Sequence, residues 1–129
     1  MNEASKKKIL VVDDDDIILN MVYHLLIGDY SIITAKSAKD AIKRISQGLI
    51  PDLIMLDIIM PDIDGWETYN RLRAISFLSD APIVFLTSLH EKKDRMHAYE
   101  IGAADYIHKP FDNDDLSERL RVILEKNKS

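Results

Sequence analysis

The sequence has no cysteine, few glycines and prolines, and no long apolar run. Without cysteine, disulfide bonds and thiolate metal sites are excluded, and a reducing cytoplasm is permitted. The four glycines and four prolines form no low-complexity tract, and no internal repeat or linker is visible. Because no apolar run is long enough for a signal-peptide core or a membrane span, we expect a cytoplasmic protein with no membrane partner.

The length and charge of the chain limit what it can be. Its 129 residues fit one domain, expected over residues 1–129 with a folded core at about 7–124. A chain of this length buries roughly 65 to 70% of its unfolded surface and needs no disulfides or structural metal to fold. Lysine and arginine total 17 against 22 acidic residues, a net charge of −5, which argues against direct nucleic-acid binding. The polar tail after residue 124 is compatible with a true end or with a linker cut from a longer protein.

Short β-branched runs alternate with longer amphipathic stretches along the chain. This pattern is typical of βαβ units around a parallel sheet. Right-handed crossovers then predict an α/β, flavodoxin-like (βα)5 three-layer sandwich with a five-stranded parallel sheet of order 2-1-3-4-5. The expected strands are 8–12, 31–35, 53–56, 82–86 and 105–108, and the expected helices are about 17–25, 37–48, 66–75, 90–101 and 112–124.

Four of the five expected strands end on residues able to do phosphate chemistry. These residues are Asp13 with Asp14, Asp57, Thr87 with Ser88, and Lys109. In a parallel sheet the carboxyl ends of all strands lie on one edge, so these side chains should meet there. Each residue taken singly is more often a cap, a turn or a surface residue, but their joint placement makes chance a poor explanation.

Asp13, Asp14 and Asp57 would repel one another unless a cation joined them. Oxygen ligands with positions left for water suit Mg²⁺, with Asp14 and Asp57 as direct ligands and Asp13 as ligand or support. The alternative is that the acids at 13–16 only cap the first helix. Both can hold, and Asp15 and Asp16 are assigned to the cap and the solvent.

Asp57 is the candidate nucleophile, because a carboxylate can accept a phosphoryl group as an acyl phosphate when the incoming charge is neutralised. Lys109 could supply part of the positive charge. Thr87 offers a hydroxyl donor, and the small Ser88 leaves room for the phosphoryl group beside its own backbone N–H.

These residues resemble the receiver domain of two-component response regulators over about residues 7–124. The motifs that carry the resemblance are Val11-Val12-Asp13-Asp14, Leu56-Asp57, Met60-Pro61, Asp64-Gly65, Leu86-Thr87-Ser88 and Lys109-Pro110-Phe111. The resemblance implies that Asp57 takes a phosphoryl group, with Mg²⁺ bound, from a sensor histidine kinase, a phosphotransfer protein or a small donor such as acetyl phosphate. It also implies that the Ile59 carbonyl is a metal ligand and that the Lys109–Pro110 peptide is cis. A receiver catalyses only its own phosphotransfer and dephosphorylation, so no metabolic enzyme is expected.

The resemblance further implies a switch. Thr87 should move toward the phosphoryl group and Tyr106 should turn inward, which would alter the face formed by 90–101, 105–108 and 112–124. That face would control an output domain or a downstream protein, and it is a candidate surface for a symmetric homodimer. The alternative for Tyr106 is simple packing on a short strand.

Two positions near the expected phosphoryl site depart from the family pattern. Ile59 stands where receivers often carry a polar residue, and Leu89, two residues beyond Thr87, is also apolar. Neither side chain can orient a water for attack on the phosphoryl group, which predicts slow self-dephosphorylation.

Three rival functions are weaker. A Mg²⁺-dependent aspartyl-phosphate phosphohydrolase could use Asp62-Ile63-Asp64, but no apolar strand precedes that segment. The intact acids and Lys109 argue against a partner-binding module that works without phosphorylation. No glycine-rich loop follows the first strand, as a flavin or nucleotide carrier would need.

Overall fold

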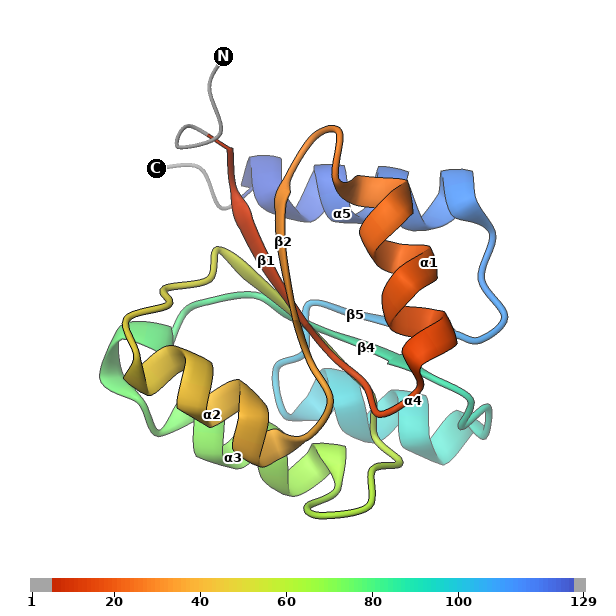
Figure 1. Ribbon diagram of the computed structural model, residues 1–129. Helices are drawn as coiled ribbons and strands as arrows, with labels where there is room; N and C mark the ends of the chain where they lie inside the picture. The colour runs from red at the N-terminus through yellow and green to blue at the C-terminus, as the bar shows by residue number, and fades with distance from the viewer. Residues whose placement is uncertain (1–5, 127–129) are drawn as a thin grey trace.

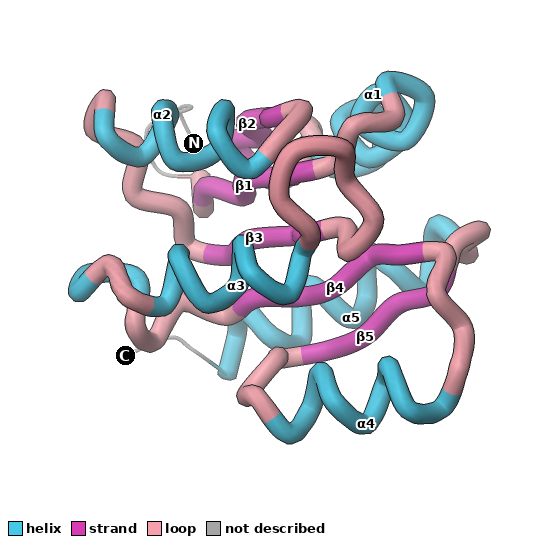
Figure 2. The backbone as a smooth tube through the Cα atoms, turned by 90° about the horizontal axis from the view of Figure 1, so that it is seen from below, coloured by secondary structure: helices cyan, strands magenta, loops and turns pink. Residues whose placement is uncertain are grey.

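The computed structural model describes residues 6–126. Within them, five parallel strands form one sheet in the order β2-β1-β3-β4-β5, as Figure 2 shows, so the predicted fold is confirmed. The strands are β1 Lys8–Val12, β2 Ser31–Ala35, β3 Leu53–Leu56, β4 Ile83–Thr87 and β5 Asp105–His108. The helices are α1 Asp16–Leu26, α2 Ala38–Ser46, α3 Gly65–Arg73, α4 Lys92–Glu100 and α5 Asn113–Lys126, with a 3-10 helix at Ser76–Leu78.

Helices cover both faces of the sheet. Helices α1 and α5 lie on one face, and α2, α3 and α4 lie on the other (Figure 1). Side chains alternate across β1 accordingly: Ile9 and Val11 pack in the core under α1 and α5, and Leu10 and Val12 pack in the opposite core. Burial on both faces explains why the central strands are continuous apolar runs. No helix in the described part of the chain is long and apolar enough to cross a membrane.

Polar side chains cap helices α1, α2 and α5. The Asp15 carboxylate accepts the Ile17 N–H at 2.9 Å at the start of α1, and the Ser37 hydroxyl accepts the Asp40 N–H at 3.0 Å at the start of α2. At the start of α5, the Asp112 carboxylate accepts the Asp115 N–H at 2.8 Å. Each cap satisfies an N–H that has no partner inside its own helix. These contacts fix where the helices begin relative to the strand ends.

The boundaries differ from the expected ones in the second half of the chain. Strand β4 begins at Ile83 rather than at Pro82, and proline has no N–H to give to a ladder. The strand ends at Thr87 rather than at Leu86, because Thr87 still pairs with His108 of β5. Helix α3 ends at Arg73, whose guanidinium donates to the carbonyls of Leu78 at 2.9 Å and Ala81 at 2.5 Å. Helix α4 is shorter than expected and begins at Lys92.

Gly65 begins α3 at a point where the backbone passes very close to the end of β3. Its N–H donates to the Ile58 carbonyl at 2.7 Å. A Cβ at this position would overlap the Asp57 carbonyl oxygen and the Ile58 Cα. The loop at 57–64 is thus closed at its base by a residue that must lack a side chain.

We predict that Gly65→Ala destabilises the protein by about 1–3 kcal/mol, because the added methyl group collides with backbone atoms. Gly28→Ala is the matched control: a Cβ added to Gly28 would meet no other atom within 4 Å, so its effect should stay within about 0.5 kcal/mol. Urea unfolding of both variants measures the difference. Equal free energies of unfolding for the two variants would contradict the prediction.

Candidate functional site

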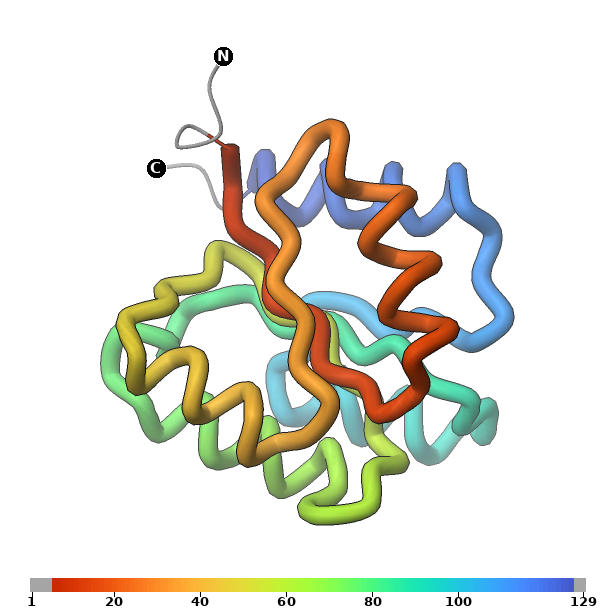
Figure 3. Tube along the Cα trace, viewed as in Figure 1, coloured from red at the N-terminus to blue at the C-terminus, as the bar shows by residue number. Residues whose placement is uncertain are grey.

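Residues far apart in the sequence meet at the carboxyl edge of the sheet. The trace in Figure 3 shows the loops that follow β1, β3, β4 and β5 on the same side of the molecule. The Lys109 ammonium lies 2.6 Å from Asp13 Oδ2 and 3.1 Å from Asp57 Oδ2. The structure thus brings the ends of β1, β3 and β5 together through one cation.

Backbone hydrogen bonds extend the sheet pairing into this edge. The Asp57 N–H donates to the Val12 carbonyl at 3.0 Å, and the Lys109 N–H donates to the Thr87 carbonyl at 2.8 Å. The residues are therefore held by the same ladder that holds the strands. The Lys109–Pro110 peptide is cis, as the sequence resemblance implies.

The two bridged carboxylates are buried and hydrogen-bonded. Asp13 is 1% exposed and Asp57 is 5% exposed. The free oxygen of Asp13 accepts the Asp15 N–H at 2.9 Å, and Asp57 Oδ1 accepts the Ile58 N–H at 2.7 Å. No buried side-chain polar atom in the described residues lacks a partner. The site is therefore preorganised, with its acceptor oxygens already directed.

Burial and charge move the pKa values of this cluster. Burial raises the pKa of Asp13 above its ordinary value, and the nearby Asp57 charge adds to this effect against the opposing pull of Lys109. Burial works against the Lys109 charge, but Asp13 and Asp57 outweigh it and raise the pKa of Lys109. Lys109 is therefore a permanent cation near neutral pH.

The carboxylates fit a divalent cation. Asp13, Asp14 and Asp57 each offer an oxygen, and these oxygens all lie within 4.8 Å of one another. Asp14 is exposed, so the cluster opens to solvent on that side. Oxygen ligands with an open side suit Mg²⁺, which keeps several waters. Three carboxylates against one ammonium leave an excess negative charge that such an ion would balance.

Thr87, Leu89 and Tyr106 form a connected path beside the cluster. Thr87 is fully buried, and its hydroxyl oxygen accepts the Leu89 N–H at 3.3 Å. The Tyr106 hydroxyl donates to the Leu89 carbonyl at 2.6 Å. Tyr106 is buried, and burial raises its pKa to about 12. The ring is therefore inward in this structure, and its coupling to a phosphoryl group stays a prediction.

The remaining candidate residues differ in their surroundings. Ser88 is exposed, and its carbonyl lies 3.2 Å from His108 Nε2. Ile59 is 54% exposed, whereas Leu89 packs partly against the core. Trp66 packs against Phe85 with ring centroids 5.0 Å apart.

The sequence offers Asp62 only as part of a rival phosphohydrolase motif and does not predict its contact with α2. Its carboxylate accepts the Lys39 N–H at 3.2 Å and so joins the loop after β3 to the beginning of α2. The two residues are 23 positions apart, and no periodic pattern links them. The only available signal was an acidic residue in a loop at the active edge, which is too common to be decisive.

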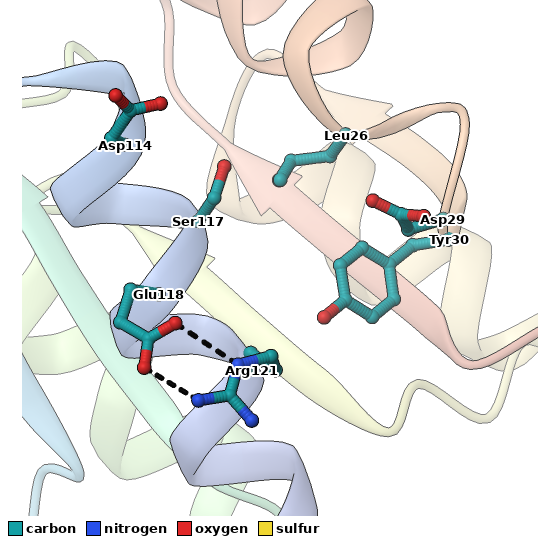
Figure 4. Close-up of a pocket in the computed structure, with 7 residues that line it drawn as sticks. All are labelled: Leu26, Asp29, Tyr30, Asp114, Ser117, Glu118 and Arg121. Atoms are coloured by element: carbon teal, nitrogen blue, oxygen red, sulfur yellow. Dashed lines mark hydrogen bonds and ion pairs between the residues drawn. The ribbon is translucent and has the colours of Figure 1, made fainter.

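A cavity of about 430 Å³ lies away from these carboxylates, between α1 and α5. Figure 4 shows its lining, in which Arg121 is already held by Glu118. The lining residues are Leu26, Asp29, Tyr30, Asp114, Ser117, Glu118 and Arg121. The cavity contains none of the residues predicted for phosphate chemistry, so the strand-end cluster is the candidate site.

The chain is similar to known signalling proteins over most of its length. Residues 9–121 match the family described as the response regulator receiver domain. The alkaline phosphatase synthesis transcriptional regulatory protein PhoP of Bacillus subtilis is 37% identical over 95% of this chain and 50% of its own length. The DNA-binding dual master transcriptional regulator RpaA of Synechocystis sp. is 38% identical over 70% of this chain and 39% of its own. The chain thus spans about half or less of these relatives.

Solved structures agree with this similarity. A two-component response regulator from Clostridium difficile superposes with a TM-score of 0.87 at 30% identity, covering 96% of this chain and all of the other. Chemotaxis protein CheY4 of Vibrio cholerae gives a TM-score of 0.85 at 29% identity, covering 92% of this chain and 99% of the other.

We predict that Asp13→Asn raises the free energy of unfolding by about 1 kcal/mol at pH 7 without divalent cations. The folded-state pKa of Asp13 is raised, so its ionisation opposes folding above that pKa and has no effect below the ordinary value of 3.8. The gain should therefore vanish by about pH 3. Lys109 keeps Asp57 as a partner in the variant.

Urea unfolding at pH 7 and pH 3 in the presence of a chelator measures this effect. Asp14→Asn is the control, because Asp14 is exposed and belongs to the same cluster. If the free energy of unfolding rose equally at both pH values, or equally in both variants, the gain would not come from removing the buried charge of Asp13.

Proposed function

Because this chain belongs to the response regulator receiver domain family, we propose that Asp57 is its phosphoryl acceptor in a two-component phosphorelay. The family consists of phosphorylation-dependent signalling switches. The observation that carries the residue assignment is the Lys109 ammonium between the buried carboxylates of Asp13 and Asp57. This arrangement presents a nucleophile beside a fixed positive charge.

In the proposed transfer, a carboxylate oxygen of Asp57 attacks phosphorus. The bond from phosphorus to the donor's nitrogen or oxygen breaks, and its electron pair leaves with the donor. Lys109 neutralises charge on the phosphoryl oxygens, and the Ile58 N–H holds the other carboxylate oxygen. Mg²⁺ held by Asp13, Asp14, Asp57 and the Ile59 carbonyl would supply further positive charge at these oxygens.

Thr87 and Ser88 complete the proposed site. The Thr87 hydroxyl is an acceptor for the Leu89 N–H, which leaves its own hydrogen available for a phosphoryl oxygen. The Ser88 backbone N–H is the second proposed donor. A movement of Thr87 toward the phosphoryl group would shift Leu89, whose carbonyl accepts the hydrogen bond from the inward Tyr106. The signal would thus reach the face made of α4, β5 and α5.

This face is also the proposed surface for a homodimer. Arg119 in α5 pairs with Asp105 and Asp115 of its own chain, each at 3.0 Å. Both pairs are partly exposed, so they contribute little stability and can exchange partners at low cost. A symmetric dimer would use the same charges across the interface.

The proposed partners follow from the family. A sensor histidine kinase or a phosphotransfer protein would supply the phosphoryl group, and an output domain or a downstream protein would respond. The chain would catalyse only its own phosphorylation and dephosphorylation. It would form one receiver domain and act in the cytoplasm. RpaA is named as a DNA-binding protein, but this chain covers only 39% of the length of RpaA. The net charge of −5 argues against direct nucleic-acid binding by this chain.

The phosphohydrolase alternative is weakened by the loop after β3. The two carboxylates that this alternative would use serve structural roles: Asp62 binds the beginning of α2, and Asp64 caps α3 by accepting the Glu67 N–H at 2.9 Å. Neither is part of the carboxylate cluster.

We expect incubation with acetyl phosphate and Mg²⁺ to add one phosphoryl group to the wild type and none to Asp57→Asn, because the amide is a poor nucleophile. Intact-mass spectrometry measures the addition. Omission of Mg²⁺ should also abolish it. Labelling that persists in Asp57→Asn would show that another residue is the acceptor.

We also expect Ile59→Asn to speed dephosphorylation by about tenfold, because an amide can orient a water that the isoleucine cannot. The loss of the phosphoryl group is followed by mass after the donor is removed. Ile50→Asn, an exposed change at a distant loop, is the control. An unchanged rate in Ile59→Asn would contradict the predicted slow self-dephosphorylation.

A further inference from the structure

The loop at 57–64 carries the Ile59 carbonyl, which the proposed function assigns to the metal. Its base is fixed, because the Gly65 N–H is bonded to the Ile58 carbonyl at 2.7 Å and the Ile58 side chain is buried. The position of the Ile59 peptide must therefore be set by what holds the loop beyond this base.

The Ile59 side chain does not hold its own peptide in place. It is 54% exposed, although its neighbour Ile58 is 3% exposed. Met60 packs only partly against the core. Pro61 then restricts the backbone, because its ring fixes φ. The next residue is Asp62, so an anchor at Asp62 acts on the Ile59 peptide through a short and stiff segment.

Asp62 is anchored to α2. Its carboxylate accepts the Lys39 N–H at 3.2 Å, one of the N–H groups at a helix start that have no partner inside the helix. The Ser37 cap takes a different group, the Asp40 N–H, so the two caps do not compete. Slight burial opposes ionisation of Asp62, but backbone N–H groups of Ile63, Lys39 and Ala38 outweigh it and lower its pKa. The carboxylate is thus ionised and faces the positive end of the helix dipole.

We propose that Asp62 is a positioning residue for the metal site: by binding the beginning of α2, it holds the Ile59 carbonyl where a divalent cation can use it. This inference rests on the proposed function. Asp62 does not touch the reacting atoms. It acts on metal affinity, whereas Asp57 and Lys109 act on the transfer itself.

The test compares three variants of the full chain: Asp62→Ala, Asp62→Asn, and Asp80→Ala as a control for the loss of one exposed carboxylate. Amide hydrogen exchange at Lys39, without Mg²⁺, reports on the anchor. Calorimetric titration with Mg²⁺ gives the affinity, and acetyl phosphate labelling at saturating Mg²⁺ gives the transfer rate. Urea unfolding checks that each variant is folded.

We expect Asp62→Ala to speed exchange at Lys39 and to weaken Mg²⁺ binding by about tenfold, as the loss of outer supports does in metal sites. The labelling rate at saturating Mg²⁺ should stay within about twofold of wild type, because the transfer groups are intact. Asp62→Asn keeps an acceptor oxygen and should restore most of the affinity. Asp80→Ala should bind Mg²⁺ as the wild type does.

Two results would overturn the inference. One is wild-type Mg²⁺ affinity in Asp62→Ala despite faster exchange at Lys39. The other is an equal loss of affinity in Asp62→Asn or Asp80→Ala, which would indicate charge alone. A wild type that neither binds Mg²⁺ nor is labelled at Asp57 would instead contradict the proposed function, so the two failures are distinguishable.

Discussion

The interaction on which the site depends is the Lys109 ammonium shared by Asp13 and Asp57. Lys109 lies 96 positions from Asp13 and 52 positions from Asp57 in the sequence. The interaction therefore joins the ends of three strands. Two buried carboxylates this close would repel each other without a cation. A buried ionic cluster is weak evidence for stability, because desolvation offsets the attraction. The raised pKa of Asp13 shows the same cost in this chain. The cluster is better explained by the chemistry that it permits.

The sheet makes this costly arrangement possible. Each central strand is buried on both faces, by α1 and α5 on one side and by α2, α3 and α4 on the other. The strands are therefore held by packing and by ladder hydrogen bonds, and the polar residues just beyond them need not contribute to the core. Asp57 and Lys109 remain in the ladder through their N–H groups. Their side chains are free to serve the site.

The features that follow from a periodic rule were predictable from the sequence. Apolar runs such as Leu53–Leu56 indicated buried parallel strands, and parallel strands bring their carboxyl ends to one edge. That rule alone gathered Asp13, Asp57 and Lys109. The contacts between loops were not predictable, because they depend on three-dimensional placement. The bond from Asp62 to α2 and the bond from Tyr106 to the Leu89 carbonyl join segments with no shared pattern. The need for glycine at position 65 likewise follows from the close approach of the Asp57 backbone, which only the structure shows.

The site thus combines two kinds of support with different consequences. The backbones of Asp57 and Lys109 are fixed by the sheet, so a substitution there removes a charged side chain and leaves the backbone geometry. Beyond its base, the loop after β3 is bonded to Lys39 through Asp62, and the loop after β4 is bonded through Leu89 to Thr87 and Tyr106. A substitution in these loops keeps the charged groups at the strand ends and changes how firmly the loop backbone is held. Under the proposed function, metal affinity can therefore change while the transfer groups stay in place, because the two depend on different contacts.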